Sequence, residues 1–265
     1  MKKATPKVDF EKITQQMKGK VVDRPNSASA GTLSGHAAGE PFEKCVLGVL
    51  REQYPKKILK QYEFLNDLFL KNPKYLTRED KCALVDSPTA QFLLCRGKTA
   101  NAKWSPENLF EEKQNDTADI LYYEPGFFNI IDVKTRNLEK NAQPPNIISS
   151  YKLAQTCALM IENEEYDTIR FDYIGIDWRE DKVNSKLVCE DAQHVSLFKV
   201  TPSVLYINWS AGLQVQFHPH SVDQTWQGSI DEWARAYLRH FVASAQHHCD
   251  AMRKKFIDPF LKYIE

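Results

Sequence analysis

Three residues combine types and spacing that suit metal-dependent hydrolysis of a phosphodiester. Asp132 and Lys134 lie two positions apart in the apolar stretch IIDVKT, after a predicted turn, and Asp119 lies before that turn. Two carboxylates that meet can hold Mg²⁺, which keeps several waters and accepts phosphate oxygens. A nearby ammonium favours loss of a proton from water and stabilises negative charge on phosphorus.

These residues need a hairpin to bring them together. Pro125 and Gly126 suit its turn, because proline fixes one dihedral and glycine tolerates positive φ. If the hairpin closes symmetrically around this pair, the numbers of paired residues sum to 251, and Asp119 lies opposite Asp132. Side chains in such pairs have Cβ atoms about 4.5–5.5 Å apart, and like charges there repel unless a cation neutralises them. Alternation along the second strand places Asp132 and Lys134 on one face.

The rest of the chain predicts one domain of mixed α/β (α+β) class, with a mainly antiparallel sheet flanked by helices. Residues 25–40 are rich in Gly, Ser and Ala and indicate a loop, so we expect an N-terminal arm over 1–40 and a core over 41–265. Apolar periodicity and capping signals predict helices from Pro41, at 60–71, 78–95 and 147–162, and from Ser229 to an interruption near Pro259. Alternation predicts strands at 118–123, 127–134, 168–177, 204–209 and 212–218.

Composition excludes several classes of protein. The 265 residues are 42% hydrophobic and 26% charged, and no apolar run is long enough to span a bilayer. The N-terminus lacks a secretory signal, so we expect a cytoplasmic protein. The six cysteines form no C-x-x-C pair, which favours reduced core thiols over a disulfide framework or a zinc site.

The zero net charge hides an uneven distribution. Residues 1–24 hold seven bases and three acids, a local +4, and residues 134–152 hold four bases and one acid, a local +3. Residues 162–191 hold ten acids and four bases. A basic face that binds nucleic acid is compatible with this pattern, although an ordinary solvated surface explains it equally.

Two other motifs are weaker. The evenly spaced Gly31, Gly35 and Gly39 lack the Gly-Lys-Ser/Thr ending of a nucleotide-binding loop. His218 and His220 offer metal ligands together with Asp223, but histidines beside a proline at a strand end are more typical of a structural or exposed position.

Several long blocks resemble type II restriction endonucleases of the HincII/HindII type. They are GTLSGHAAGEPFEK (31–44), QYEFLNDLF (61–69), NLFEEKQNDTADIL (108–121), DVKTRN (132–137), PNIISSYKLAQTCA (145–158) and LYINW (205–209). The resemblance implies the PD-(D/E)xK nuclease fold, a restriction-endonuclease-like core, and homodimers that cut duplex DNA with Mg²⁺. It also implies the palindromic target GTYRAC, cut blunt at its centre to leave 5′-phosphates.

The resemblance also implies residue roles. Asp119 and Asp132 match the family's metal-binding carboxylates, Lys134 its catalytic lysine, and Val133 a residue whose backbone carbonyl is a further metal ligand. Ala118 replaces the proline of the usual motif. Glu40 resembles an accessory acid, although a carboxylate at a helix start explains it equally.

DNA contacts follow from the same resemblance. Gln143 and Asn146 lie in a loop that resembles the family's DNA-contacting segment, where Pro144 departs from the usual sequence, and Asn208 resembles a second reading position. Amides suit this role because they both donate to and accept from base edges. Arg96 and Lys98 are candidates for holding phosphates.

Two alternatives remain open at this point. One is a DNA-binding protein without hydrolysis, in which Asp132 and Lys134 form a structural ion pair. The other is a repair or junction nuclease with the same core and shape-based specificity. A restriction enzyme also implies a methyltransferase in the same cell that protects the host's own sites.

Overall fold

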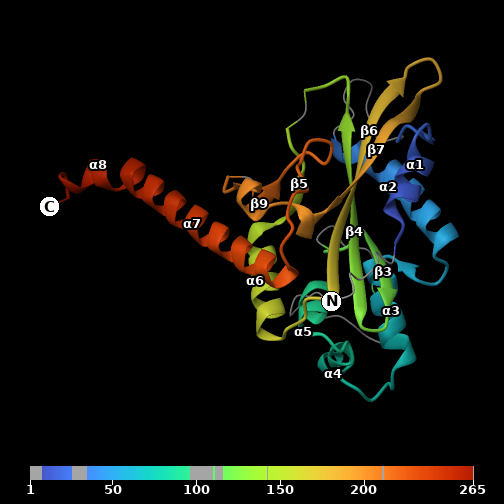
Figure 1. Cartoon of the computed structure of the whole chain (residues 1–265), viewed down its shortest axis with the longest axis horizontal. Helices are drawn as coiled ribbons and strands as arrows, with labels where there is room; N and C mark the ends of the chain where they lie inside the picture. The colour runs from blue at the N-terminus through green and yellow to red at the C-terminus, as the bar shows by residue number, and fades with distance from the viewer. Residues whose placement is uncertain are drawn as a thin grey trace.

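The structure is a computed structural model that describes residues 8–25, 35–95, 110, 116–141, 143–210 and 212–264. Its centre is a six-stranded sheet in the order β1-β7-β6-β4-β3-β2. The strands are β1 (Val21–Asp23), β2 (Ile58–Leu59), β3 (Ile120–Glu124), β4 (Phe127–Asn137), β6 (Ile169–Asp181) and β7 (Lys186–Ser196). Neighbouring strands are antiparallel except β4 and β6, which are parallel. The predicted mixed, mainly antiparallel sheet flanked by helices is confirmed (Figure 1).

A smaller sheet lies beside the first and has the order β5-β9-β8. Its strands are β5 (Asn146–Ser149), β8 (Tyr206–Asn208) and β9 (Gln214–Gln216). The chain leaves β4 through β5, crosses in α6 (Ser150–Glu162) and enters β6. This long connection is what allows β4 and β6 to run parallel.

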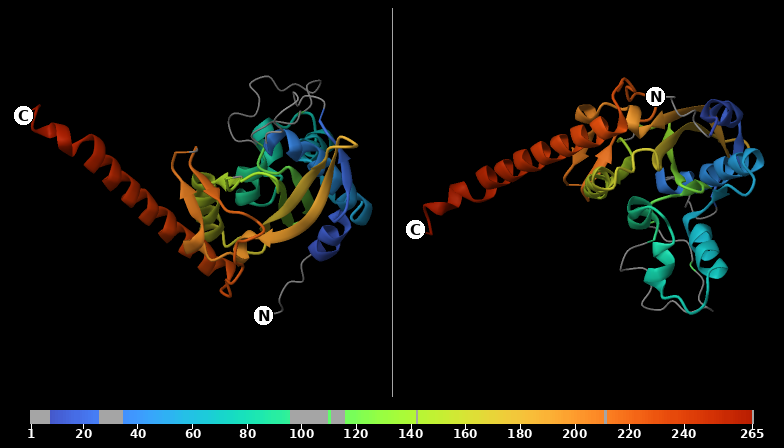
Figure 2. Two further views of the ribbon diagram at one scale, coloured as in Figure 1. Left: turned by 90° about the horizontal axis from the view of Figure 1, so that it is seen from above. Right: turned by 60° about the horizontal axis from the view of Figure 1, so that its bottom comes forward.

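Helices flank the central sheet on both faces. They are α1 (Phe10–Met17), α2 (Gly35–Gln53), α3 (Gln61–Lys71), α4 (Arg78–Ala83), α5 (Pro88–Leu94), α6, α7 (Ile230–Phe256) and α8 (Asp258–Leu261), with short 3₁₀ turns at Leu197–Lys199 and Pro202–Val204. In the views of Figure 2, α1 and α2 lie at one side of the curled sheet, and α6 and the start of α7 lie at the other. No helix in the described part of the chain is long and apolar enough to cross a bilayer.

The two faces of β4 belong to two different cores. Phe128 and Ile130 pack in the core that contains α6 and the start of α7. Ile131 and Val133 pack in the core formed with α1 and α2. Because alternate residues of a strand point to opposite faces, this division confirms that Asp132 shares the face of Ile130 and Lys134.

Several predicted elements were wrong in extent. The helix expected from Pro41 begins at Gly35 and contains that proline, so part of the predicted 25–40 loop is helical. The helix expected over 78–95 is two helices, because Ser87 caps a new helix whose first residue is Pro88. The helix expected from residue 147 begins at Ser150, after the short strand β5.

The sequence pattern did not predict β7 or α1. β7 pairs with β6 along most of its length, yet its sequence KLVCEDAQHVS alternates poorly because a bulge at Glu190 shifts its register. The capping box predicted at Ser229 and Glu232 does begin α7. Cys95, Cys157 and Cys189 are buried, as expected of core thiols, whereas Cys249 on α7 is exposed.

Candidate active site

The β3–β4 hairpin has the predicted register. Ile120 pairs with Ile131 and Glu124 with Phe127, so paired residue numbers sum to 251. Gly126 has φ of +75°, the conformation for which glycine was expected in this turn. Asp119 directly precedes β3, and continuing the register by one residue places it opposite Asp132.

Asp132 and Lys134 are in contact on the same face of β4. The Nζ atom of Lys134 lies 2.5 Å from Oδ2 of Asp132, and the two side chains are 20% and 13% exposed. The side chain of Val133 packs on the other face of the sheet, in the core with α1 and α2. Only its backbone carbonyl is therefore available for the role that the resemblance implies.

Asp119 lies within electrostatic reach of both partners. The pKa of Asp119 is raised to about 9, chiefly by burial and then by the charge of Asp132 and a hydrogen bond with it, against the opposing effect of Lys134. Burial by itself would lower the pKa of Lys134, but the charges of Asp132 and Asp119 outweigh it and raise that pKa. The structure thus brings together the three residues predicted to carry the chemistry.

The arrangement fits a hard divalent cation. Oδ1 of Asp132 is buried and, with both carboxyls ionised, receives no hydrogen bond from the part of the chain that the structure describes. Either a proton shared with Asp119 or a cation satisfies that oxygen. Among the described residues no group of three or more His, Cys, Asp or Glu side chains forms a metal cage. Two carboxylates with open positions suit Mg²⁺, which keeps waters and takes phosphate oxygens.

A third carboxylate, which the sequence analysis missed, acts on the site. Glu43 on α2 forms an ion pair with Lys60 at 3.2 Å, and its charge raises the pKa of both Asp119 and Lys134. Glu40, the predicted accessory acid, is exposed and pairs with Lys44 at 2.6 Å, which lowers the pKa of Glu40. No spacing rule separates Glu43 from other helix carboxylates before the packing of α2 is known.

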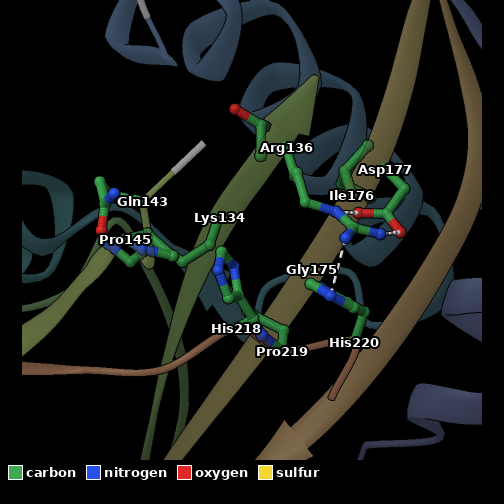
Figure 3. A pocket seen from close by; sticks show the side chains of 11 residues that line it. Lys134, Arg136, Gln143, Pro145, Gly175, Ile176, Asp177, His218, Pro219 and His220 are labelled. Carbon is green, nitrogen blue, oxygen red and sulfur yellow. Dashed lines mark hydrogen bonds and ion pairs between the residues drawn. The ribbon is translucent and has the colours of Figure 1, made fainter. Parts of the chain in front are cut away.

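A pocket opens beside Lys134 on the same side of the sheet (Figure 3). Its lining joins the end of β4 to the predicted DNA-contacting loop and to the segment after β9. The lining residues are Lys134, Thr135, Arg136, Gln143, Pro145, Gly175, Ile176, Asp177, His218, Pro219 and His220. Gln143, a predicted reading residue, therefore lines the same pocket as Lys134.

Arg136 connects three parts of this pocket. Its Nε and Nη2 atoms donate to the carboxylate of Asp177 on β6 at 2.8 and 2.5 Å, and its Nη1 atom lies 2.7 Å from Nε2 of His220 (Figure 3). A guanidinium can only donate, so Nε2 of His220 accepts and the ring is neutral with its proton on Nδ1. Burial and the charge of Arg136 lower the pKa of His220, which agrees with this state.

The segment that carries His218 and His220 is seated on a glycine. A Cβ atom added to Gly175 on β6 would lie 2.5 Å from Cβ of Pro219, so a larger residue would displace the segment. The two imidazole rings lie 4.9 Å apart between centroids. Both histidines are half-buried rather than exposed, and Asp223, their proposed metal-binding companion, is exposed.

The other predicted reading residues meet in the smaller sheet. Nε2 of Gln216 donates to Oδ1 of Asn146 at 2.8 Å, and Nδ2 of Asn208 donates to Oε1 of Gln216 at 3.0 Å. Gln216 on β9 thus links Asn146 on β5 to Asn208 on β8. Sequence reasoning recorded Gln216 only as a polar strand residue. Arg96 and Lys98 lie outside the described residues.

Comparisons with known proteins find chains that are similar to this one. The model of the restriction endonuclease HincII family matches residues 13–264. The chain is 52% identical over 256 residues to the type II restriction enzymes HindII and HincII, both of Haemophilus influenzae, with 96% of this chain and 97% of each relative covered. The NlaIV restriction endonuclease aligns over 91% of this chain and 86% of its own, with 12% identity and a TM-score of 0.34.

Proposed function

The chain belongs to the HincII family of restriction endonucleases, and we propose that it cuts both strands of duplex DNA at GTYRAC in the presence of Mg²⁺. Its class is that of a type II restriction enzyme, a site-specific deoxyribonuclease. The observation that carries the proposal is the convergence of Asp119, Asp132 and Lys134 at the end of one hairpin. The target sequence and the blunt cut at its centre rest on the family resemblance.

In this proposal Asp119 and Asp132 hold the cation, with the backbone carbonyl of Val133 as a third protein ligand. When bound there, Mg²⁺ supplies a Lewis acid for the phosphate and lowers the pKa of a bound water. Lys134 places its ammonium beside the scissile phosphate, orients the attacking water and stabilises the negative charge that develops on phosphorus. The new bond joins water oxygen to phosphorus, and the bond to O3′ breaks, so the products carry 3′-hydroxyls and 5′-phosphates.

Recognition in this proposal comes from amides. Gln143 lies beside Lys134, and the pair Asn146 and Asn208 is held together by Gln216. Amide groups read base edges in the major groove by donating and accepting at once. Arg96 and Lys98 remain candidates for phosphate contacts, and Glu40 for an accessory acid.

The remaining parts of the proposal concern partners. A palindromic target calls for a homodimer, because a two-fold protein presents one hydrolytic centre to each strand. We also infer one endonuclease domain, a cytoplasmic location, and a methyltransferase in the same cell that modifies the target.

A plasmid digest tests the proposal. A plasmid of known sequence is incubated with the protein and Mg²⁺, EDTA is added to a parallel sample, and the fragment ends are sequenced. We expect blunt ends within GTYRAC, 5′-phosphates, and no cutting with EDTA. Asp132→Ala should abolish cutting, whereas Asp67→Ala, which changes an exposed aspartate of α3, should not. Full activity of Asp132→Ala, or cutting at unrelated sequences, would overturn the proposal.

A further inference from the structure

α7 leaves the body of the molecule and carries an apolar stripe that the body leaves largely exposed. The helix has 27 residues and is about 40 Å long at 1.5 Å per residue. In both figures its second half points away from both sheets and ends at the C-terminus (Figures 1 and 2). Val242 is 63% exposed, Met252 44% and Phe256 53%. Full burial of such a side chain would contribute about 1.5–3 kcal/mol of stabilisation.

α7 has two apolar faces: the first packs on its own chain, and the second is mostly exposed, although Leu238 at its start packs partly against the body. Trp233 and Tyr237 are buried, and Trp209 stacks on Phe241 and His248 with centroids 6.1 and 4.9 Å apart. At 100° per residue these positions lie on one side of the helix. The second stripe lies roughly 100° around the helix from the first and consists of Leu238, Val242, Ala245, Cys249, Met252 and Phe256.

The spacing of the second stripe is that of a helix-pairing seam. Its steps are 4, 3, 4, 3 and 4 residues, the alternation found at the a and d positions of coiled coils. The steps read the same in both directions. In an antiparallel pair centred on His247, residue numbers sum to 494, so Leu238 meets Phe256, Val242 meets Met252 and Ala245 meets Cys249. A contact in which residue i meets j and j meets i is the signature of a two-fold interface.

The charges beside the stripe permit this pairing. Arg239 of one helix comes near Arg253 of the other, but Arg253 is already paired with Asp258, its Nε lying 3.3 Å from Oδ1. Phe241 comes near Lys255, a pairing that a cation and an aromatic ring favour. DNA is a poorer occupant of the stripe, because phosphates are bound by bases rather than by Met, Val and Phe side chains.

We propose that the second stripe of α7 is the surface that binds a second copy of this chain, with the two α7 helices antiparallel about His247. This inference deepens the homodimer part of the proposed function, and it does not depend on the hydrolytic chemistry. The partner of the second stripe is therefore the same stripe on the second copy of the chain. The hydrolytic centre lies in the body, so the pairing can be tested without altering it.

A cysteine at position 245 tests the antiparallel register in the full-length chain. Ala245→Cys should form a disulfide with the partner's Cys249 under mild oxidation with copper phenanthroline. Most of the protein should then run as a dimer on a non-reducing gel. Ala251→Cys, an exposed alanine roughly 120° around the helix from Ala245, is the matched control and should give little dimer. Adding Cys249→Ser to Ala245→Cys should remove most of the crosslink.

Light scattering of Val242→Glu and Met252→Glu gives a second readout, with Ala251→Glu as control. We expect the two stripe variants to be monomers at concentrations where the control and the wild type are dimers, and circular dichroism shows whether they are folded. Folded stripe variants that remain dimers, or equal crosslinking of Ala245→Cys and Ala251→Cys, would overturn the α7 proposal and leave the homodimer standing. A monomeric wild type would overturn both. Loss of DNA affinity with an unchanged dimer would assign the stripe to DNA.

Discussion

Lys134 pairs with one oxygen of Asp132 and leaves the other oxygen of that carboxylate to Asp119. The ammonium lies 2.5 Å from Oδ2, while Oδ1 is buried without a donor from the described residues when both carboxyls are ionised. Asp132 is thus divided between a lysine and a second acid, and the metal-free site is electrostatically unfavourable. Sites arranged for chemistry commonly reduce the stability of the protein that holds them.

Asp119→Asn should therefore stabilise the metal-free protein while abolishing cleavage. The folded-state pKa of about 9 is above the ordinary value of 3.8, so between these values the folded state binds more protons than the unfolded state. Stability is then lost as the pH rises, by about 1.4 kcal/mol per pH unit. In thermal unfolding with EDTA, the midpoint temperature of Asp119→Asn should be higher than that of the wild type at pH 8. The difference between the two midpoints should shrink toward pH 5.

Asp67→Asn, an exposed aspartate on α3, is the control for this comparison and should follow the wild type at both pH values. An Asp119→Asn variant that unfolds at a lower temperature than the wild type at pH 8 would mean that the acid pair is not repulsive.

His220→Ala should weaken productive DNA binding, because it leaves Nη1 of Arg136 without the acceptor it has at 2.7 Å. His220→Gln retains an acceptor and should restore most of the activity. We expect a several-fold rise in KM for the alanine variant with a smaller change in kcat, measured by steady-state cleavage. An equal loss of activity in His220→Ala and His220→Gln would indicate that the imidazole ring is needed for packing rather than as the acceptor for Arg136.

The same contact predicts a pH dependence. Burial lowers the pKa of both His220 and His218 below 6.5, so between the lowered value and 6.5 the unfolded state binds more protons. Stability should fall as the pH drops below 6.5, as protonated His220 meets the guanidinium of Arg136. Asp177, which pairs with the same guanidinium at 2.5 Å, is the carboxylate that faces this contact. Urea unfolding between pH 7 and 5 should give a flatter profile for His220→Gln than for the wild type.

Gly175→Ala should displace the segment that carries both histidines, because the added Cβ would lie 2.5 Å from Cβ of Pro219. Overpacking of this kind costs about 1–3 kcal/mol. Gly48→Ala is the control, since nothing lies within 4 Å of its added Cβ and the residue is inside α2, where alanine is favoured. Denaturant unfolding should give a lower free energy of unfolding for Gly175→Ala than for the wild type. For Gly48→Ala this free energy should be unchanged or higher.

Gln216→Leu should relax the choice of target, because it removes the amide that joins Asn146 to Asn208. Sites with one altered base pair should be cut about tenfold faster relative to GTTAAC, the scale of one good base contact. Gln214→Leu changes a glutamine of the same strand whose amide nitrogen donates to the carbonyl of Gly212 at 3.3 Å, and it should leave this rate ratio unchanged. If the cleavage rate at altered sites relative to GTTAAC were the same in both variants, Gln216 would have no part in target recognition.

Local rules predicted the β3–β4 hairpin well. Alternation, a Pro-Gly turn and a symmetric loop were sufficient to place Asp119, Asp132 and Lys134 together, because all three depend on residues close in sequence. Glu43 and Gln216 were missed since their roles depend on how α2 and β9 pack, which no local pattern contains. β7 was missed because the bulge at Glu190 interrupts its alternation.

Helix ends were predicted less well than helix faces. Pro41 suggested a first helical position, yet it lies inside α2, since a proline removes one hydrogen bond without preventing the turn before it from being helical. The face of α7 that meets the body contains the buried Trp233 and Tyr237. Its second stripe becomes visible only once the helix is seen to leave the body.

A crystal structure of the protein with a GTTAAC duplex and Ca²⁺ tests the central claim most directly, because Ca²⁺ occupies oxygen sites of this kind. We expect the cation within about 2.6 Å of carboxylate oxygens of both Asp119 and Asp132 and of one phosphate oxygen, with Nζ of Lys134 beside the same phosphate. A cation bound elsewhere, or a scissile phosphate distant from these three side chains, would contradict the account.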